Sequence, residues 1–215
     1  MNYRISTAVV IISAFLISAG DAVGKAAQAA PRREHAIEKA GFRRDMRKLW
    51  EDHITWTRLY IVSALADLPD REVTANRLLQ NQSDIGNAIK PLYGDAAGDK
   101  LTVLLKDHIL IAADLIAGAR VGDTARSNRA GARWYANADS IAGFLSSANP
   151  EYWRLGEMKS MMHEHLAATT AEVVARLTKD WTGDIRAYDN VHAQILSMAD
   201  MLSDGMIGQF GSRFR

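Results

Sequence analysis

Six long stretches of this chain carry apolar residues at steps of three and four, a spacing that predicts helices rather than strands. No stretch alternates with the period of two that a half-buried strand requires. Proline is rare, and three prolines (Pro69, Pro91 and Pro150) lie between the stretches and mark joints. The predicted helices cover residues 35–67, 71–89, 96–120, 124–147, 151–178 and 184–210. We therefore expect an all-α fold, a bundle of about six helices.

The first 29 residues have the composition of a secretory signal peptide. Arg4 precedes an apolar stretch that ends near Ala19, and small residues follow it as far as Ala29. The apolar stretch is shorter than the roughly 20 residues that span a bilayer, which favours a cleaved signal over the alternative, a retained anchor. We expect residues 1–29 to be removed and residues 30–215 to form a single helical-bundle domain in the periplasm or outside the cell.

The predicted mature chain is neutral. The whole chain has 26 basic and 25 acidic residues, and loss of two basic residues and one acidic residue with the signal leaves 24 of each. This balance argues against nucleic acid or an anionic membrane as a partner, because both require a basic face. Cysteine is absent from the sequence, so a metal ion would need nitrogen, oxygen or thioether ligands.

A helical hairpin of roughly 55 residues is predicted to occur three times. Its first helix carries an acid followed by a histidine near its middle: Asp52-His53, Asp107-His108 and Glu164-His165. Its second helix carries a polar residue 28, 29 or 27 residues after that histidine: Asn81, Asn137 and His192. We expect these six positions to lie at one level of the bundle.

The neighbours three and four residues away from His53, His108, His165 and His192 are mainly apolar, which predicts that these histidines face the core. Each alone is explained as a core histidine bonded to a nearby hydroxyl or amide. Together, at matching positions, they suggest a shared metal site, with Asp189 on the same helix face as His192. Neutral imidazoles suit zinc, and also copper or iron. The predicted function is metal handling or a metal-dependent reaction.

Two alternatives do without a metal. The first is a binding module whose pocket holds a small polar ligand, lined by Asn81, Asn137, Trp50, Trp56, Thr57, Tyr60 and Tyr188. The second is a structural or stress-protective bundle without a site. The sequence has no Gly-x-Ser-x-Gly elbow and no Gly-rich phosphate loop, so it identifies no catalytic residue and leaves enzymatic activity open.

Several segments carry a resemblance to known sequences. Residues 49–58, 77–79 and 84–94 read LWEDHITWTR, RLL and DIGNAIKPLYG. With Trp134-Tyr135 and Asn137-Ala138-Asp139, they resemble a group of small bacterial all-helical proteins whose function is not established. Such sequences sometimes carry the label acetylglutamate kinase or glycosyltransferase, and both labels imply an α/β fold that this periodicity does not support. The resemblance implies an all-helical fold and supplies no catalytic residue.

Overall fold

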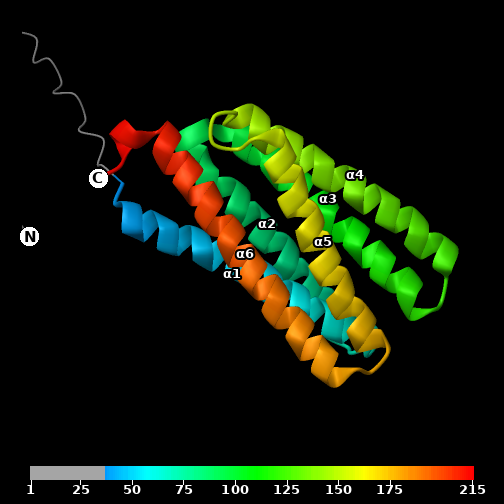
Figure 1. Cartoon of the computed structure of the whole chain (residues 1–215). Coiled ribbons are helices and arrows are strands. Elements are labelled where there is room, and N and C mark those ends of the chain that lie inside the picture. The colour runs from blue at the N-terminus through cyan, green and yellow to red at the C-terminus, as the bar shows by residue number, and fades with distance from the viewer. Residues whose placement is uncertain (1–36) are drawn as a thin grey trace, which may run out of the picture. The chain divides into compact units, whose positions relative to one another are not determined.

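The computed structural model describes residues 37–215 (Figure 1). It contains six helices: α1 (Lys39–Leu65), α2 (Arg71–Tyr93), α3 (Asp95–Arg120), α4 (Thr124–Ala148), α5 (Leu155–Leu177) and α6 (Trp181–Gln209), followed by a short 3-10 helix, η1 (Gly211–Arg213). The all-α prediction is confirmed. No helix among the described residues is long and apolar enough to cross a bilayer. The predicted signal peptide lies outside the described residues.

The helix boundaries differ from the predicted ones for local reasons. α1 begins at Lys39, because the Glu38 carboxylate accepts a hydrogen bond from the backbone N–H of Ala40 at 2.9 Å and so caps the first turn. α2 continues through Pro91 instead of stopping before it. It ends at Tyr93. The next residue, Gly94, has a φ of 85°, which favours glycine, and its N–H donates to the Lys90 carbonyl at 2.8 Å. The glycine, and not the proline, ends this helix.

The six helices form three hairpins, and the last hairpin packs against the first to close a ring. Each helix packs against the next one in sequence, and α6 returns to pack along α1. α1 also contacts α3 and α5, so the first helices of the three hairpins face one another across the interior. The backbone joins the two ends of the described chain, since the Ile37 N–H donates to the Arg213 carbonyl at 2.8 Å.

The apolar core is divided into two clusters. The larger one includes Trp50, Leu105 and Met162, and the smaller one consists of Ile61, Ala64, Ile116 and Val173. Along α1, α3 and α5, one histidine lies between these larger-cluster residues and the members of the smaller cluster. The fold thus places a polar layer inside an otherwise apolar interior.

Candidate histidine site

His53 of α1, His108 of α3 and His165 of α5 lie together in the bundle interior. Each is 3 % exposed. The ring centroids of His53 and His165 are 5.7 Å apart, and those of His108 and His165 are 6.2 Å apart. Three histidines separated by more than fifty residues each in sequence therefore form one cluster.

Each of the three rings makes the same hydrogen bond. Its Nδ1 pairs with a side-chain amide oxygen on the second helix of its own hairpin, 29 residues later in every case. The Nδ1–oxygen distances are 3.2 Å for His53–Gln82, 2.9 Å for His108–Asn137 and 3.2 Å for His165–Gln194. The three hairpins are thus equivalent in the contact that orients the imidazole.

The amide groups determine which ring nitrogen carries the proton. Their nitrogens donate to the carbonyls of Leu78 (2.8 Å), Leu104 (3.1 Å) and Met161 (3.1 Å). Because each amide nitrogen is used in this way, the oxygen faces the ring, and only a protonated Nδ1 can donate to it. Each ring therefore has a proton on Nδ1 and a lone pair on Nε2.

An independent contact supports this tautomer at His108. The indole Nε1–H of Trp134 donates to His108 Nε2 at 3.1 Å, and an indole N–H can only donate. No described residue donates to Nε2 of His53 or of His165. The cluster thus contains one lone pair that is paired within the protein and two that are not.

The three imidazoles are uncharged at neutral pH. Burial lowers the pKa of His108 to about 3 and that of His165 to about 4, and His165 further lowers the pKa of His108. Burial, followed by the neighbouring His165 and His108, holds the pKa of His53 well below its usual value. Protonation is therefore unfavourable here because the interior is dry and the rings would repel one another.

The rings line an enclosed cavity of about 20 Å³. Thr57, Tyr60 and Trp134 also line it, among mainly aliphatic side chains. A space of this size holds about one water molecule or one ion. The cavity can therefore accept a small cation or hydrogen-bond donor, but no organic ligand without a change in the fold.

The structure places two of the predicted metal ligands outside this cluster. His192 lies on α6 with its side chain 34 % exposed, and its Nε2 is 2.9 Å from the Glu51 carboxylate of α1. Asp189 is exposed to solvent. The face of α6 that points inward presents Gln194 instead, two residues beyond His192, which is about 200° around the helix.

The predicted pocket residues divide in a similar way. Asn137 bonds to His108, and Thr57 and Tyr60 line the cavity. Asn81 lies next to the site: it donates to the Leu49 carbonyl at 3.0 Å and accepts from Gln82 at 3.0 Å.

The remaining aromatic residues of that prediction do not line the cavity. Trp50 packs in the apolar core with its ring centroid 5.8 Å from that of His53. The guanidinium of Arg77 covers the Trp56 ring at 4.9 Å, and that of Arg58 covers the Tyr188 ring at 5.5 Å.

The cluster is not arranged as a finished metal centre. Within residues 37–215, no group of three or more His, Asp or Glu side chains is placed to hold an ion. Tetrahedral coordination at ordinary metal–nitrogen lengths would bring ring centroids to about 5 Å from one another. The observed 5.7 and 6.2 Å exceed this by an ångström or so.

Comparison with known protein families, curated proteins and solved structures finds no match to this chain. The chemistry of the site therefore has to be inferred from the site itself. Its defining property is an excess of buried, neutral nitrogen acceptors that share one small cavity.

Proposed function

We propose that the buried cluster binds a transition metal ion through Nε2 of His53, His108 and His165. The observation that supports this most is the common orientation of the rings. In each of them Nδ1–H is held by an amide oxygen, which leaves Nε2 as the acceptor: that of His108 receives the Trp134 N–H, and those of His53 and His165 have no donor among the described residues. Metal-binding histidines are commonly oriented by a hydrogen bond from their other ring nitrogen.

The energetics also favour a ligand. Nε2 of His53 and Nε2 of His165 have no donor among the described residues, so a ligand in the cavity would supply a partner for each. A metal ion would pair both lone pairs at once. Because the rings are neutral at pH 7, the ion would not have to displace protons from them.

Binding requires two changes. The rings must approach one another by an ångström or so and tilt toward a common point, since the His108 and His165 planes lie 28° apart, and His108 must give up the hydrogen bond from Trp134. The second change costs about 1 kcal/mol, the net contribution of an ordinary hydrogen bond. This cost is small beside the affinity of several imidazoles for zinc, copper or iron.

The cavity volume favours a metal ion over the small-molecule alternative. Pockets for organic ligands measure roughly 300–1,000 Å³, whereas this one measures about 20 Å³. A single water molecule is the remaining competitor, and in that case the cluster would be a hydrated polar layer of a structural bundle.

Two further parts of the proposal concern the chain as a whole. We propose that the N-terminal segment directs export of the bundle. A metal-handling role would then act on ions outside the cytoplasm. We also propose that the three hairpins derive from one repeated unit. The constant spacing of 29 residues between each histidine and its amide partner supports this origin.

The test is a titration of the purified protein, carrying no affinity tag, with Co²⁺ or Zn²⁺. We expect about one ion per chain, with binding lost in His53→Ala and in His165→Ala. His163→Ala and His192→Ala serve as matched controls, because these histidines bond to Asp139 and Glu51 away from the cavity. Binding that persists without His53 and His165, or that never exceeds the background of the controls, would refute the metal site.

A further inference from the structure

An open groove lies directly outside the histidine cavity. It measures about 710 Å³ and is bordered by α4 and α5, with the end of α3 as its floor. Four residues line both the groove and the cavity: Leu115, Trp134, Thr170 and Val173. The barrier between solvent and the imidazoles is therefore one side chain thick at this place.

Of the four residues in this barrier, Trp134 is the one that hydrogen-bonds to a histidine. Its side chain is buried, with 4 % of its surface exposed, and its ring centroid is 5.2 Å from that of His108. The same indole donates its N–H to His108 Nε2. One side chain thus both closes the wall and occupies the lone pair of one histidine.

The groove exists because small residues face it from both helices. Gly131 and Ala132 of α4 lie opposite Ala167 of α5. A Cβ added at Gly131 would meet only Leu115 Cδ1, at 3.8 Å. This space gives the indole room to turn outward without displacing backbone.

The covalent connection between α4 and α5 does not cross the groove. The two helices belong to different hairpins and are joined by residues 149–154, at the end away from the groove (Figure 1). The Asp139 carboxylate contacts Lys159 (2.9 Å) and His163 (2.9 Å) nearer the joined end.

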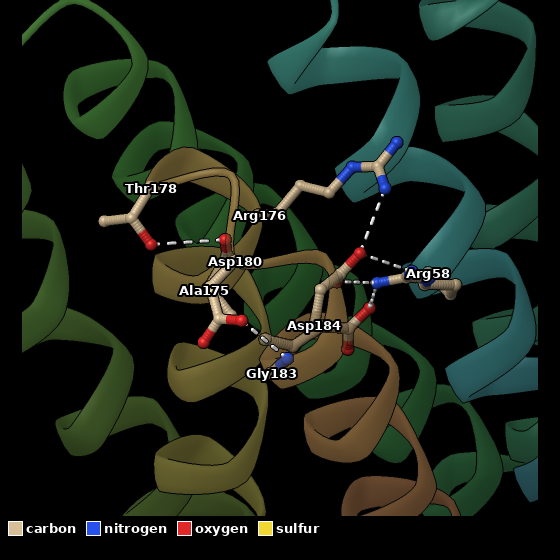
Figure 2. Close-up of polar contacts among 8 residues, drawn as sticks. Arg58, Ala175, Arg176, Thr178, Asp180, Gly183 and Asp184 are labelled. Atoms are coloured by element: carbon tan, nitrogen blue, oxygen red, sulfur yellow. Dashed lines mark hydrogen bonds and ion pairs between the residues drawn. The ribbon is translucent and has the colours of Figure 1, made fainter.

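On its other side, α5 is held by buried charges. Arg58 of α1 binds Glu172 of α5 at 2.9 Å and Asp184 of α6 at 2.8 Å, and Arg176 of α5 binds Asp184 at 3.0 Å. Figure 2 shows the two arginines converging on Asp184. Breaking a buried pair of this kind is expensive, so these contacts hold α5 to α1 and α6. On the α4 side, the wall contains Trp134 and the small residues Gly131 and Ala132.

We propose that the groove between α4 and α5 is the access route to the three histidines, and that Trp134 is its gate. Outward rotation of the indole opens the wall and releases the lone pair of His108 in one step. For a metal ion as the incoming ligand this inference rests on the proposed function, but access to the imidazoles can be measured without any metal.

The first experiment uses diethyl pyrocarbonate, a small electrophile that acylates neutral imidazole nitrogen, on the full chain at pH 7. Modification of each histidine is followed by peptide mapping in the wild type, Trp134→Ala and Trp50→Ala. Trp50 is the matched control, because it is also 4 % exposed but lines neither the cavity nor the groove. His163 and His192 provide internal reference rates.

We expect Trp134→Ala to raise the modification rates of His108 and His165 about tenfold or more, and Trp50→Ala to leave them near the wild-type value. A tenfold change corresponds to a loss of about 1.4 kcal/mol in the free energy that favours the closed wall over the open one. Equal acceleration in both variants would mean general loosening and would overturn the gate, as would wild-type rates in Trp134→Ala. Trp134→Phe keeps the ring without the N–H and should give an intermediate rate, so the test survives if the alanine variant fails to fold.

The second experiment measures Co²⁺ association by stopped flow in the same variants. Faster uptake in Trp134→Ala than in Trp50→Ala supports the gate, and equal rates of uptake contradict it. If no variant takes up Co²⁺ while the acylation pattern is as expected, the metal proposal fails and the access route stands.

Discussion

Asn137 satisfies two buried groups on the facing helix with one short side chain. Its oxygen accepts from His108 Nδ1 at 2.9 Å and its nitrogen donates to the Leu104 carbonyl, one turn earlier on α3, at 3.1 Å. Gln194 makes the same pair of contacts to His165 and Met161. In the first hairpin the two tasks are divided, since Gln82 bonds to His53 and Asn81 bonds to Leu49.

Replacing Asn137 with alanine should therefore destabilise the protein by about 1–3 kcal/mol, because it leaves a buried ring N–H without its acceptor. Asn190→Ala is the control. It makes the same chemical change at an exposed position of α6, and exposed substitutions usually stay within about 0.5 kcal/mol. Urea unfolding of both variants measures the difference, and equal midpoints would show that the amide does not support the imidazole.

The sequence predicts the three clustered histidines, but its candidates at the same level of the return helices differ from the observed bonding partners at two positions. Asn81 and His192 were expected on the return helices, whereas Gln82 and Gln194 make the contacts. A change of one residue turns a side chain by about 100° around a helix, so a spacing accurate to within two residues does not identify the inward-facing one. Requiring one constant spacing and an amide at each position would have selected Gln82, Asn137 and Gln194.

Trp134 is harder to predict. It lies 26 residues after His108, and the other two hairpins have no matching contact. Its role depends on the packing of α3 against α4, which periodicity does not reveal.

At the level of the helices, two glycines allow α2 and α3 to approach closely. α2 and α3 meet at Gly86 and Gly98, where a Cβ on Gly86 would lie 2.6 Å from the Gly98 carbonyl oxygen. Each of these helices carries one partner of a histidine contact, Gln82 on α2 and His108 on α3. The glycine pair thus determines the spacing between the first two hairpins.

Gly86→Ala should destabilise the bundle although alanine favours a helix by about 1 kcal/mol over glycine. The added methyl would force backbone apart, and overpacking of this kind costs about 1–3 kcal/mol. Gly143→Ala in α4 is the matched control, since a Cβ there meets nothing within 4 Å and should stabilise. Thermal unfolding of the two variants should shift in opposite directions. A rise in both would show that the approach of α2 and α3 is not tight.

The six helices were predictable because their apolar periodicity is long. A carboxylate caps the first turn of α1, α4 and α6. The ends of the helices were less predictable. α6 begins at Trp181, before the predicted residue 184, because the Asp180 carboxylate accepts a hydrogen bond from the Gly183 N–H at 2.9 Å. From the sequence alone, a helix that starts at 184 and one that starts three residues earlier are equally acceptable.

For the whole molecule, the packing of α6 along α1 closes the ring of helices and turns three separate hairpins into one interior. That closure is a long-range contact, which local sequence patterns do not encode. It is also what buries all three imidazoles in a common space, and so it links the fold to the acid stability of the protein.

The stability of the bundle should fall as the pH falls below about 6.5. An unfolded chain protonates its histidines near this pH, whereas the folded protein holds the pKa of His165 at about 4 and that of His108 at about 3. Between these values the unfolded state binds more protons, so the free energy of unfolding decreases with decreasing pH by about 1.4 kcal/mol per pH unit for each histidine.

Denaturant unfolding between pH 8 and pH 4.5 measures this slope. Glu172 opposes this loss of stability at the lower pH values. Burial raises the pKa of its carboxyl above the usual value, so the folded state binds this proton more readily than the unfolded state. His165→Gln, which keeps a polar side chain but cannot be protonated, should lower the slope by about one third if the three rings contribute equally. Asn190→Ala, which removes no imidazole and lies at an exposed position of α6, is the control and should leave the slope unchanged. Constant stability between pH 7 and pH 5 would mean that water or a counter-charge reaches the imidazoles in the folded protein.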